Sequence, residues 1–158
     1  MLTKGTGIGA LDLRPISVMM IIYRVWAAHH VGEIMAWQNL WVSADIFGFR
    51  QASDCKDAFY QTALDIATAL LEGRAICGCS MDFAKAFDLV PREIIFQIAQ
   101  HTGVPQRILR PLKGMYAQLE RRFRVGPCVG TAWKSANGIL QGCPISVALL
   151  NLLMQVWT

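Results

Sequence analysis

Asp82 follows a short run of small and apolar residues, 74–81, and an aromatic residue, Phe87, comes five positions later. Burying an unpaired carboxylate is costly unless a cation lies beside it. In phosphoryl transfer that cation is commonly Mg²⁺, held by carboxylates while it holds the attacking and leaving oxygens. An isolated Asp is more often a helix cap or half of a surface ion pair. Asp82 is therefore a candidate metal ligand whose assignment depends on its neighbours.

A second candidate site is the glycine-bounded loop Gly138–Pro144. Gly142 has no Cβ and would let a ligand approach the backbone closely, while the Gln141 amide both donates and accepts hydrogen bonds. The loop spacing alone is weak evidence. It becomes informative because the loop follows the Asp82 segment by about fifty residues.

The window between Arg107 and Lys134 is locally basic, with seven basic residues and one acid, although the whole chain carries only +4. Clustered cations suit a surface that faces phosphates, because binding releases counterions from the nucleic acid. A solvated helix and hairpin face explains the same pattern. Both interpretations remain open on the sequence alone.

Apolar spacing predicts the helices that would position these residues. The first predicted helix covers 15–28, where the spacing of Tyr23, Trp26 and Ala27 indicates that it is buried. Four more are predicted: from Ser53 or Asp54 to Gly73, from Pro91 to about Gln100, after Pro105, and from Pro144 onward. The helix after Pro105 has the apolar stripe Ile108, Leu109, Leu112, Met115, Tyr116 and Leu119, opposite Arg107, Arg110 and Lys113. The helix from Pro144 has no stop signal before Thr158, so we expect the chain to end inside the fold.

Two segments predict strands. Residues 74–83 are short, flanked by glycine and apolar, which favours a buried strand ending near Asp82. Phe123 and Val125 alternate with Arg122 and Arg124, which is typical of a half-exposed strand. Mixed helix and strand in one chain of 158 residues indicates a single α+β domain or a large piece of one.

The composition is unusually apolar, at 54% hydrophobic and 16% charged residues, which suggests a core that lacks part of its cover. The longest apolar run, 16–28, is too short for a membrane span and contains Arg24, and the N-terminus lacks a secretory signal. We therefore expect no membrane association and an intracellular protein of the nucleus or cytoplasm. Five cysteines without paired metal-ligand spacing predict reduced packing residues.

Four segments resemble motifs of reverse transcriptases, in particular those of non-LTR, LINE-like retrotransposons. Residues 81–90 (MDFAKAFDLV) resemble motif A, and residues 137–146 (NGILQGCPIS), with Asn151 following, resemble motif B. Residues 13–17 (LRPIS) resemble the R-P-I-S box of the fingers, and 47–50 (FGFR) more loosely resemble the G-F-R element. The resemblance covers nearly the whole chain in the family's order.

The resemblance implies roles for individual residues. Asp82 would be the catalytic metal ligand, and Phe87 the steric gate that excludes a 2′-hydroxyl. Arg14 would contact the triphosphate, which suits a guanidinium, while Phe83, Gln141 and Gly142 would line the nucleotide site. Lys4 and Arg50 are weaker candidates for nucleotide or template contact, and Arg50 could equally brace the fold. Arg121, Arg122 and Arg124 would face a nucleic-acid backbone. Asp88 belongs to the motif but receives no role.

The implied fold is α+β, the fingers and partial palm of a right-hand polymerase, with fingers elements at about 1–74 and partial palm at about 75–158. The implied partners are an RNA template, a DNA or RNA primer and a dNTP, with two Mg²⁺ ions, or Mn²⁺, as cofactor. The family's Ala-Asp-Asp motif and thumb have no counterpart, and no Asp-Asp pair occurs in the sequence. We therefore expect a chain truncated after motif B and inactive alone.

Other interpretations compete with this one. The chain could be a non-catalytic, nucleic-acid-binding remnant of a retroelement, or the product of a decayed element that never folds stably. Residues 5–10 (GTGIGA) match a dinucleotide-binding pattern, but only four residues precede them, so no strand can enter the loop and the match is attributed to chance. His29 and His30 are adjacent on a helix and are interpreted as structural.

Overall fold

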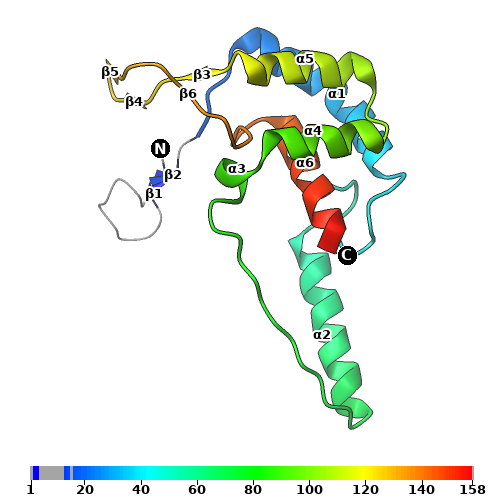
Figure 1. Ribbon diagram of the computed structural model, residues 1–158. Helices are drawn as coiled ribbons and strands as arrows, with labels where there is room; N and C mark the ends of the chain where they lie inside the picture. Colours follow the sequence, from blue (N-terminus) through cyan, green and yellow to red (C-terminus); the bar gives the residue numbers. More distant parts are fainter. Residues whose placement is uncertain (1, 4–12, 15, 158) are drawn as a thin grey trace.

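The computed structural model describes residues 2–3, 13–14 and 16–157 (Figure 1). Its helices are α1 (Ile21–Gln38), α2 (Cys55–Leu71), α3 (Ala86–Leu89), α4 (Arg92–His101), α5 (Gln106–Ala117) and α6 (Pro144–Met154), followed by the 3-10 turn η2 (Gln155–Trp157). Its strands are β1 (Leu2–Thr3), β2 (Leu13–Arg14), β3 (Glu120–Arg121), β4 (Arg124–Val125), β5 (Cys128–Val129) and β6 (Trp133–Lys134). The mixed α+β class expected from the sequence is confirmed.

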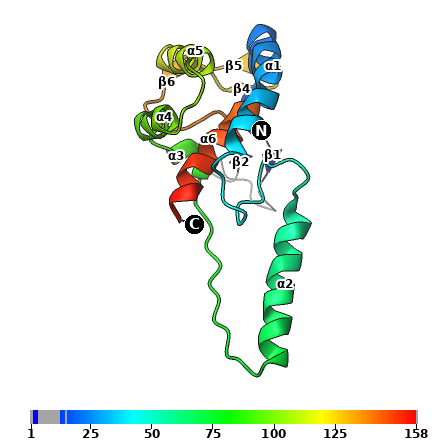
Figure 2. The same ribbon diagram turned by 90° about the vertical axis from the view of Figure 1, so that its right-hand side faces the viewer.

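The core lies between α1, α4, α5 and α6, where α6 packs against both α1 and α4, and α4 packs against α5 (Figure 2). The apolar stripe of α5 faces this core: Ile108, Leu109 and Leu112 are buried, while Arg107 and Arg110 on its other face are exposed. The predicted stripe is confirmed except for Leu119, which lies beyond the end of the helix. Pro144 begins α6 as predicted, but the α-helix ends at Met154.

Helix α1 begins later than predicted and is only partly buried. Ala27 is buried, and Tyr23 and Trp26 pack against the core, as their spacing indicated. Ile22 and Val25 on the other side are exposed, so the prediction of a buried helix over 15–28 is wrong for that face. Apolar spacing identifies which residues share a face but not whether a neighbour covers it.

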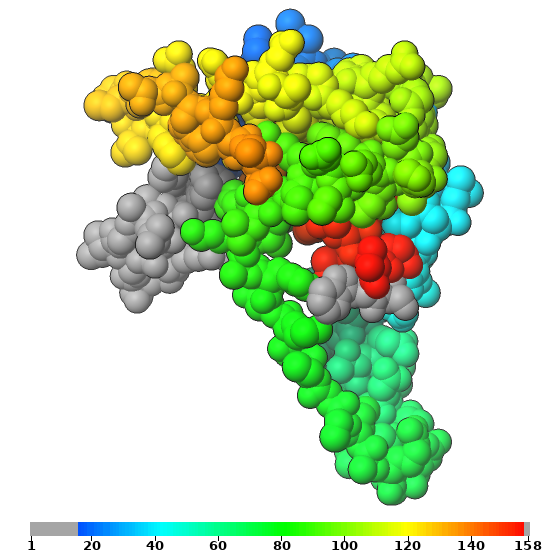
Figure 3. All heavy atoms as spheres, in the orientation of Figure 1, coloured from blue at the N-terminus to red at the C-terminus, as the bar shows by residue number. Residues whose placement is uncertain are grey.

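Helix α2 has the predicted start and end. Asp54 accepts a hydrogen bond from the backbone N–H of Lys56, and Asp57 accepts one from the backbone N–H of Asp54, a reciprocal cap. The large apolar side chains of α2 are nevertheless in solvent: Phe59, Leu70 and Leu71 are exposed, and Ala69 is the buried residue of α2. Figure 3 shows α2 and the following segment extending away from the body of the molecule.

The prediction of a buried strand over 74–83 is wrong. The segment is irregular and exposed along its whole length, and it connects the far end of α2 to α3. A buried strand needs neighbours that pair with its N–H and C=O groups and cover both faces. Neither is provided here, since the sheets among the described residues are the pairs β1–β2, β3–β6 and β4–β5.

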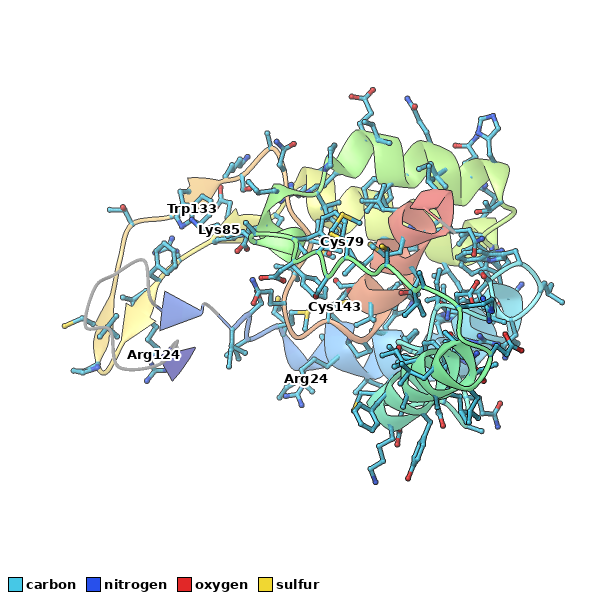
Figure 4. The ribbon with its side chains drawn as sticks, turned by 90° about the horizontal axis from the view of Figure 1, so that it is seen from below. Arg24, Cys79, Lys85, Arg124, Trp133 and Cys143 are labelled. Carbon is cyan, nitrogen blue, oxygen red and sulfur yellow. The ribbon has the colours of Figure 1, made fainter. Side chains whose placement is uncertain are left out.

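Strands β3 to β6 form an antiparallel hairpin, in which Arg121 pairs with Trp133 and Val125 pairs with Cys128. We call residues 120–134 the basic hairpin. Phe123 lies between β3 and β4, so the predicted strand is interrupted, and both of its faces are exposed rather than one. Figure 4, seen from below, shows the basic hairpin extending to one side of the helices.

The cysteines are free, as expected, but the expectation that all pack in the interior is wrong. Cys143 is buried, whereas Cys55, Cys77, Cys79 and Cys128 are exposed. No helix within residues 16–157 is both long and apolar enough to cross a membrane.

Candidate active site

The end of motif A and the loop of motif B lie against each other. The backbone N–H of Gly138 donates to the carbonyl of Val90 at 2.8 Å, and the N–H of Ile139 donates to the carbonyl of Phe87 at 2.7 Å. These bonds join segments about fifty residues apart in the chain. The structure thus brings together two of the motifs that the sequence predicted to share a site.

Gly138 is required at this junction for two reasons. Its φ of +85° is unfavourable for a residue with a side chain. A Cβ there would also lie 2.6 Å from the backbone oxygen of Asp88, closer than such atoms approach in proteins. Any other residue would push the two motifs apart.

The Gln141 side chain is held by Asp88. Its Nε2 donates to the Asp88 carboxylate at 3.1 Å, in partly buried surroundings. This contact gives Asp88 a structural role that the sequence left unassigned. It also fixes the orientation of the Gln141 amide, a predicted nucleotide contact.

The segment after the R-P-I-S arginine forms the third side of the site. The backbone N–H of Ser17 donates to the carbonyl of Gln141 at 2.9 Å. Gly142 has a φ of +103°, and a Cβ on it would lie 3.2 Å from the Ser17 carbonyl. Gly142 therefore allows the loop to approach residues 16–17 closely.

Arg92, which the sequence analysis did not select, organises the loop from behind. Its guanidinium is buried and donates to the carbonyls of Gly138 (2.6 Å), Ser135 (2.6 Å) and Asn137 (2.9 Å). It also lies over the Tyr116 ring, 5.1 Å from the centroid. One rigid, planar donor thus holds several carbonyls of one loop. The only available signal was an arginine in the first turn of a helix whose other inward residues are apolar.

Two tyrosines support the same loop from the core. The Tyr116 hydroxyl accepts from the backbone N–H of Leu140 at 3.0 Å and lies 3.3 Å from the Ser146 hydroxyl. The Tyr23 hydroxyl lies 2.9 Å from the Cys143 sulfur, which Figure 4 labels where the loop enters α6. Burial raises the pKa of both tyrosines, so both hydroxyls stay protonated at neutral pH.

Among the described residues, no carboxylate forms an ion pair with the Arg92 guanidinium. Burial, and after it the positive charge of Arg121, lower the pKa of Arg92 from its ordinary value. Arginine nonetheless remains charged at neutral pH. Carbonyl oxygens and the Tyr116 ring therefore stabilise the Arg92 charge in place of a carboxylate.

The motif A side chains are spread over two environments. Phe87, in the short helix α3, is half-buried and packs against the core. Asp82 and Phe83 lie before it on the exposed segment and are themselves exposed. The Phe87 backbone thus contacts the motif B loop. Asp82 is exposed, although its position in the sequence predicted burial.

The remaining predicted residues fall in different places. Arg14 lies in β2, paired with Leu2, and its side chain is outside the described residues, as are Lys4 and the glycine pattern at 5–10. Arg50 donates to the carbonyls of Ser43 and Ala44, both at 3.0 Å, which matches the bracing alternative.

The G-F-R element is fixed to the motif B helix. Asn151 Nδ2 donates to the carbonyl of Gly48 at 2.8 Å, and Gln38 Nε2 donates to the carbonyl of Phe49 at 2.8 Å. Both amide side chains are buried. The resemblance included Asn151 but not this contact, which ties α6 to the 47–50 turn.

A complete metal centre is not formed by the described residues: they contain no group of three or more His, Cys, Asp or Glu side chains that could hold an ion. Asp82 can supply one carboxylate, and the Asp88 carboxylate accepts from Gln141.

Comparison with known proteins supports the family suggested by the motifs. No solved structure matches the chain. The family described as reverse transcriptase (RNA-dependent DNA polymerase) matches residues 4–157, which is nearly the whole sequence. The match extends over all four motif segments and the contacts that join them. The chain therefore belongs to the reverse transcriptase family.

Proposed function

We propose that this chain is the fingers and partial palm of an RNA-directed DNA polymerase from a non-LTR retrotransposon, with fingers elements at about 1–74 and partial palm at about 75–158. The observation that carries the proposal is the junction of residues 87–90, 138–142 and 16–17. Three motifs of one polymerase family meet there through backbone hydrogen bonds and glycine contacts. A chance resemblance would not require its separate motifs to meet.

In this proposal the junction holds the incoming dNTP opposite an RNA template base. Gln141 and Gly142 contact the nascent base pair, with the Gln141 amide oriented by Asp88. Phe87, fixed by the core, presents a rigid edge that excludes a ribonucleotide 2′-hydroxyl. Phe83 lies near the sugar, and Arg14, with Lys4 as a weaker candidate, binds the triphosphate.

Mg²⁺ would neutralise the triphosphate and activate the primer 3′-oxygen in the complete enzyme. Asp82 is proposed as one of its carboxylate ligands, since carboxylate oxygen is the ligand that Mg²⁺ prefers. The described residues do not add the further carboxylates that two ions need. We therefore expect residues 1–158 alone not to extend a primer.

The proposal is tested by nucleotide binding rather than by catalysis. With Mg²⁺ present, the 158-residue chain should bind a fluorescent dNTP more tightly than the matching NTP. Phe87→Val should reduce this preference, because a smaller side chain admits the 2′-hydroxyl. Phe59→Val, on the exposed face of α2, is the matched control. Equal affinity for dNTP and NTP in the unmodified chain would contradict the proposal.

The alternative function is a non-catalytic nucleic-acid-binding remnant. It is favoured by the exposed cations of the basic hairpin, Arg122 and Arg124, which lie on a different element from Asp82. RNA binding that survives Asp82→Ala, together with no binding of any dNTP, would support this alternative over the polymerase.

A further inference from the structure

The basic hairpin carries a pair of aromatic rings that the body of the protein does not cover. Phe123 and Trp133 stack with their ring centroids 5.7 Å apart and their planes 24° apart. Phe123 remains 48% exposed and Trp133 38% exposed. Pairing two rings across a hairpin stabilises it, but full burial of the rings would be expected if packing were their only role.

Cations surround this pair. The hairpin contains Arg121, Arg122, Arg124 and Lys134 against a single acid, Glu120. Lys134 lies 4.0 Å from Glu120, so those two charges offset each other. The arginines at 121, 122 and 124 remain without an acidic partner on the hairpin.

The three arginines do not have equal access to a ligand. Arg121 lies over the Trp133 ring, 5.6 Å from its centroid, and its Nε and Nη2 atoms are buried without a hydrogen-bond partner among the described residues. Arg121 therefore acts mainly in packing the ring. Arg122 and Arg124 are exposed on either side of Phe123, and Arg124 Nε donates to the carbonyl of Gly126 at 3.1 Å.

We propose that the basic hairpin binds a single-stranded nucleic acid, with an unpaired base stacked on the Phe123–Trp133 pair and the flanking phosphates against Arg122 and Arg124. Exposed aromatic faces bordered by arginines are the combination that binds unpaired strands, because every base has a face that can stack. A duplex buries its base faces internally and could use the arginines alone.

The hairpin proposal rests on the proposed polymerase function in one respect: it takes the bound strand to be the RNA template. The hairpin side chains named above recognise a base face and phosphates, and none of them is assigned to the 2′-hydroxyl. Single-stranded DNA of the same sequence should therefore bind with similar affinity. An acidic protein segment would satisfy the arginines but would not need the exposed rings.

The test measures fluorescence anisotropy of a short labelled RNA with the 158-residue chain, free of nucleotide. Phe123→Ala should weaken binding of the single strand about tenfold, with little effect on the same sequence as a duplex. Phe123→Leu, which keeps an apolar side chain but has no ring, should also weaken it, and Phe123→Tyr should restore it. Phe59→Ala, another exposed aromatic on α2, is the control.

A second experiment measures how much Arg122 and Arg124 contribute to RNA binding. Replacing both Arg122 and Arg124 by Gln should lower the slope of log affinity against log salt by about 1.4 for the single strand, from about 0.7 for each phosphate contact. Arg110→Gln, exposed on α5, should change the slope less. Melting curves of every variant verify that the hairpin changes leave the helical core folded.

The proposal is overturned if Phe123→Ala and Phe59→Ala give the same affinity, if duplex binds as tightly as single strand, or if polyglutamate competes as well as RNA. Binding of dNTP in the same preparations distinguishes this proposal from the polymerase proposal. Phe123→Ala should leave dNTP affinity unchanged. If the unmodified chain binds no dNTP, the polymerase proposal is contradicted, but the RNA affinities of the Phe123 variants still test the hairpin proposal.

Discussion

The Gln141 side-chain amide donates to the Asp88 carboxylate at 3.1 Å, linking the loop of motif B to the end of motif A. Gly138 makes the same connection through the backbone, three residues earlier. One side-chain and two backbone hydrogen bonds therefore determine how the two motifs face each other.

Asp88→Ala should impair nucleotide binding through Gln141 rather than directly. Removing the acceptor frees the Gln141 amide to rotate, so both Asp88→Ala and Gln141→Ala should weaken dNTP binding. If Asp88 acts only through Gln141, the double variant should bind no more weakly than Gln141→Ala, giving a coupling energy of about 1 kcal/mol. Titrations of the four proteins with a fluorescent dNTP measure this coupling, and strictly additive effects would show that the two residues act independently.

Gly138→Ala should destabilise the fold by more than about 1 kcal/mol. The substitution imposes a positive φ on alanine, and its Cβ meets the Asp88 carbonyl oxygen at 2.6 Å. Gly114→Ala is the matched control: it lies inside α5 with no atom within 4 Å of the added Cβ, so the helix should gain about 0.5–1 kcal/mol. Urea unfolding of both variants measures the two changes. The free energy of unfolding should fall for Gly138→Ala and rise for Gly114→Ala, although the two changes need not be equal in size.

Arg92→Lys should lower the free energy of unfolding by about 2–3 kcal/mol. The charge is kept, but the three N–H groups of an ammonium share one nitrogen, whereas Arg92 contacts the three carbonyls through Nε, Nη1 and Nη2, so carbonyls of the 135–138 loop lose their donors. Arg110→Lys, on the exposed face of α5, should change stability by less than about 0.5 kcal/mol. Thermal and urea unfolding measure both, and a similar small effect of the two substitutions would remove Arg92 from its proposed role.

Local signals predicted much of the helical body. The Asp54 and Asp57 cap, Pro91 before α4, the stripe of α5 and Pro144 at the start of α6 all act within a few residues, so the sequence contains them. Arg92 could not be found in this way, because the carbonyls that it contacts, those of Ser135, Asn137 and Gly138, lie more than forty residues away in the sequence.

The wrong predictions of burial share one physical cause. The apolar faces of α1 and α2, and the 74–83 segment, carry residue types suited to burial, but burial depends on a neighbouring element that local spacing does not reveal. Motif resemblance selected Gln141 and Gly142, which the structure brings to the junction, and Asp82, which it leaves exposed.

Tyr116→Phe should cost about 1–2 kcal/mol at neutral pH, because the buried N–H of Leu140 loses its acceptor. It should also change the alkaline limb of the stability profile. Burial raises the pKa of Tyr116 in the folded state above its unfolded value near 10, so the unfolded chain releases the proton first. Stability from this group is therefore complete below about pH 10 and falls as pH rises beyond that value.

The phenylalanine variant lacks the proton, so its unfolding free energy should fall less steeply above about pH 10 than that of the unmodified chain. Tyr60→Phe, which removes an exposed hydroxyl from α2, is the control variant. Urea unfolding at several values between neutral and alkaline pH measures the three profiles. Parallel profiles for Tyr116→Phe and the unmodified chain would mean that the Tyr116 hydroxyl ionises as easily in the folded protein as in the unfolded one. In that case, the Tyr116 hydroxyl would not be buried between α5 and the motif B loop.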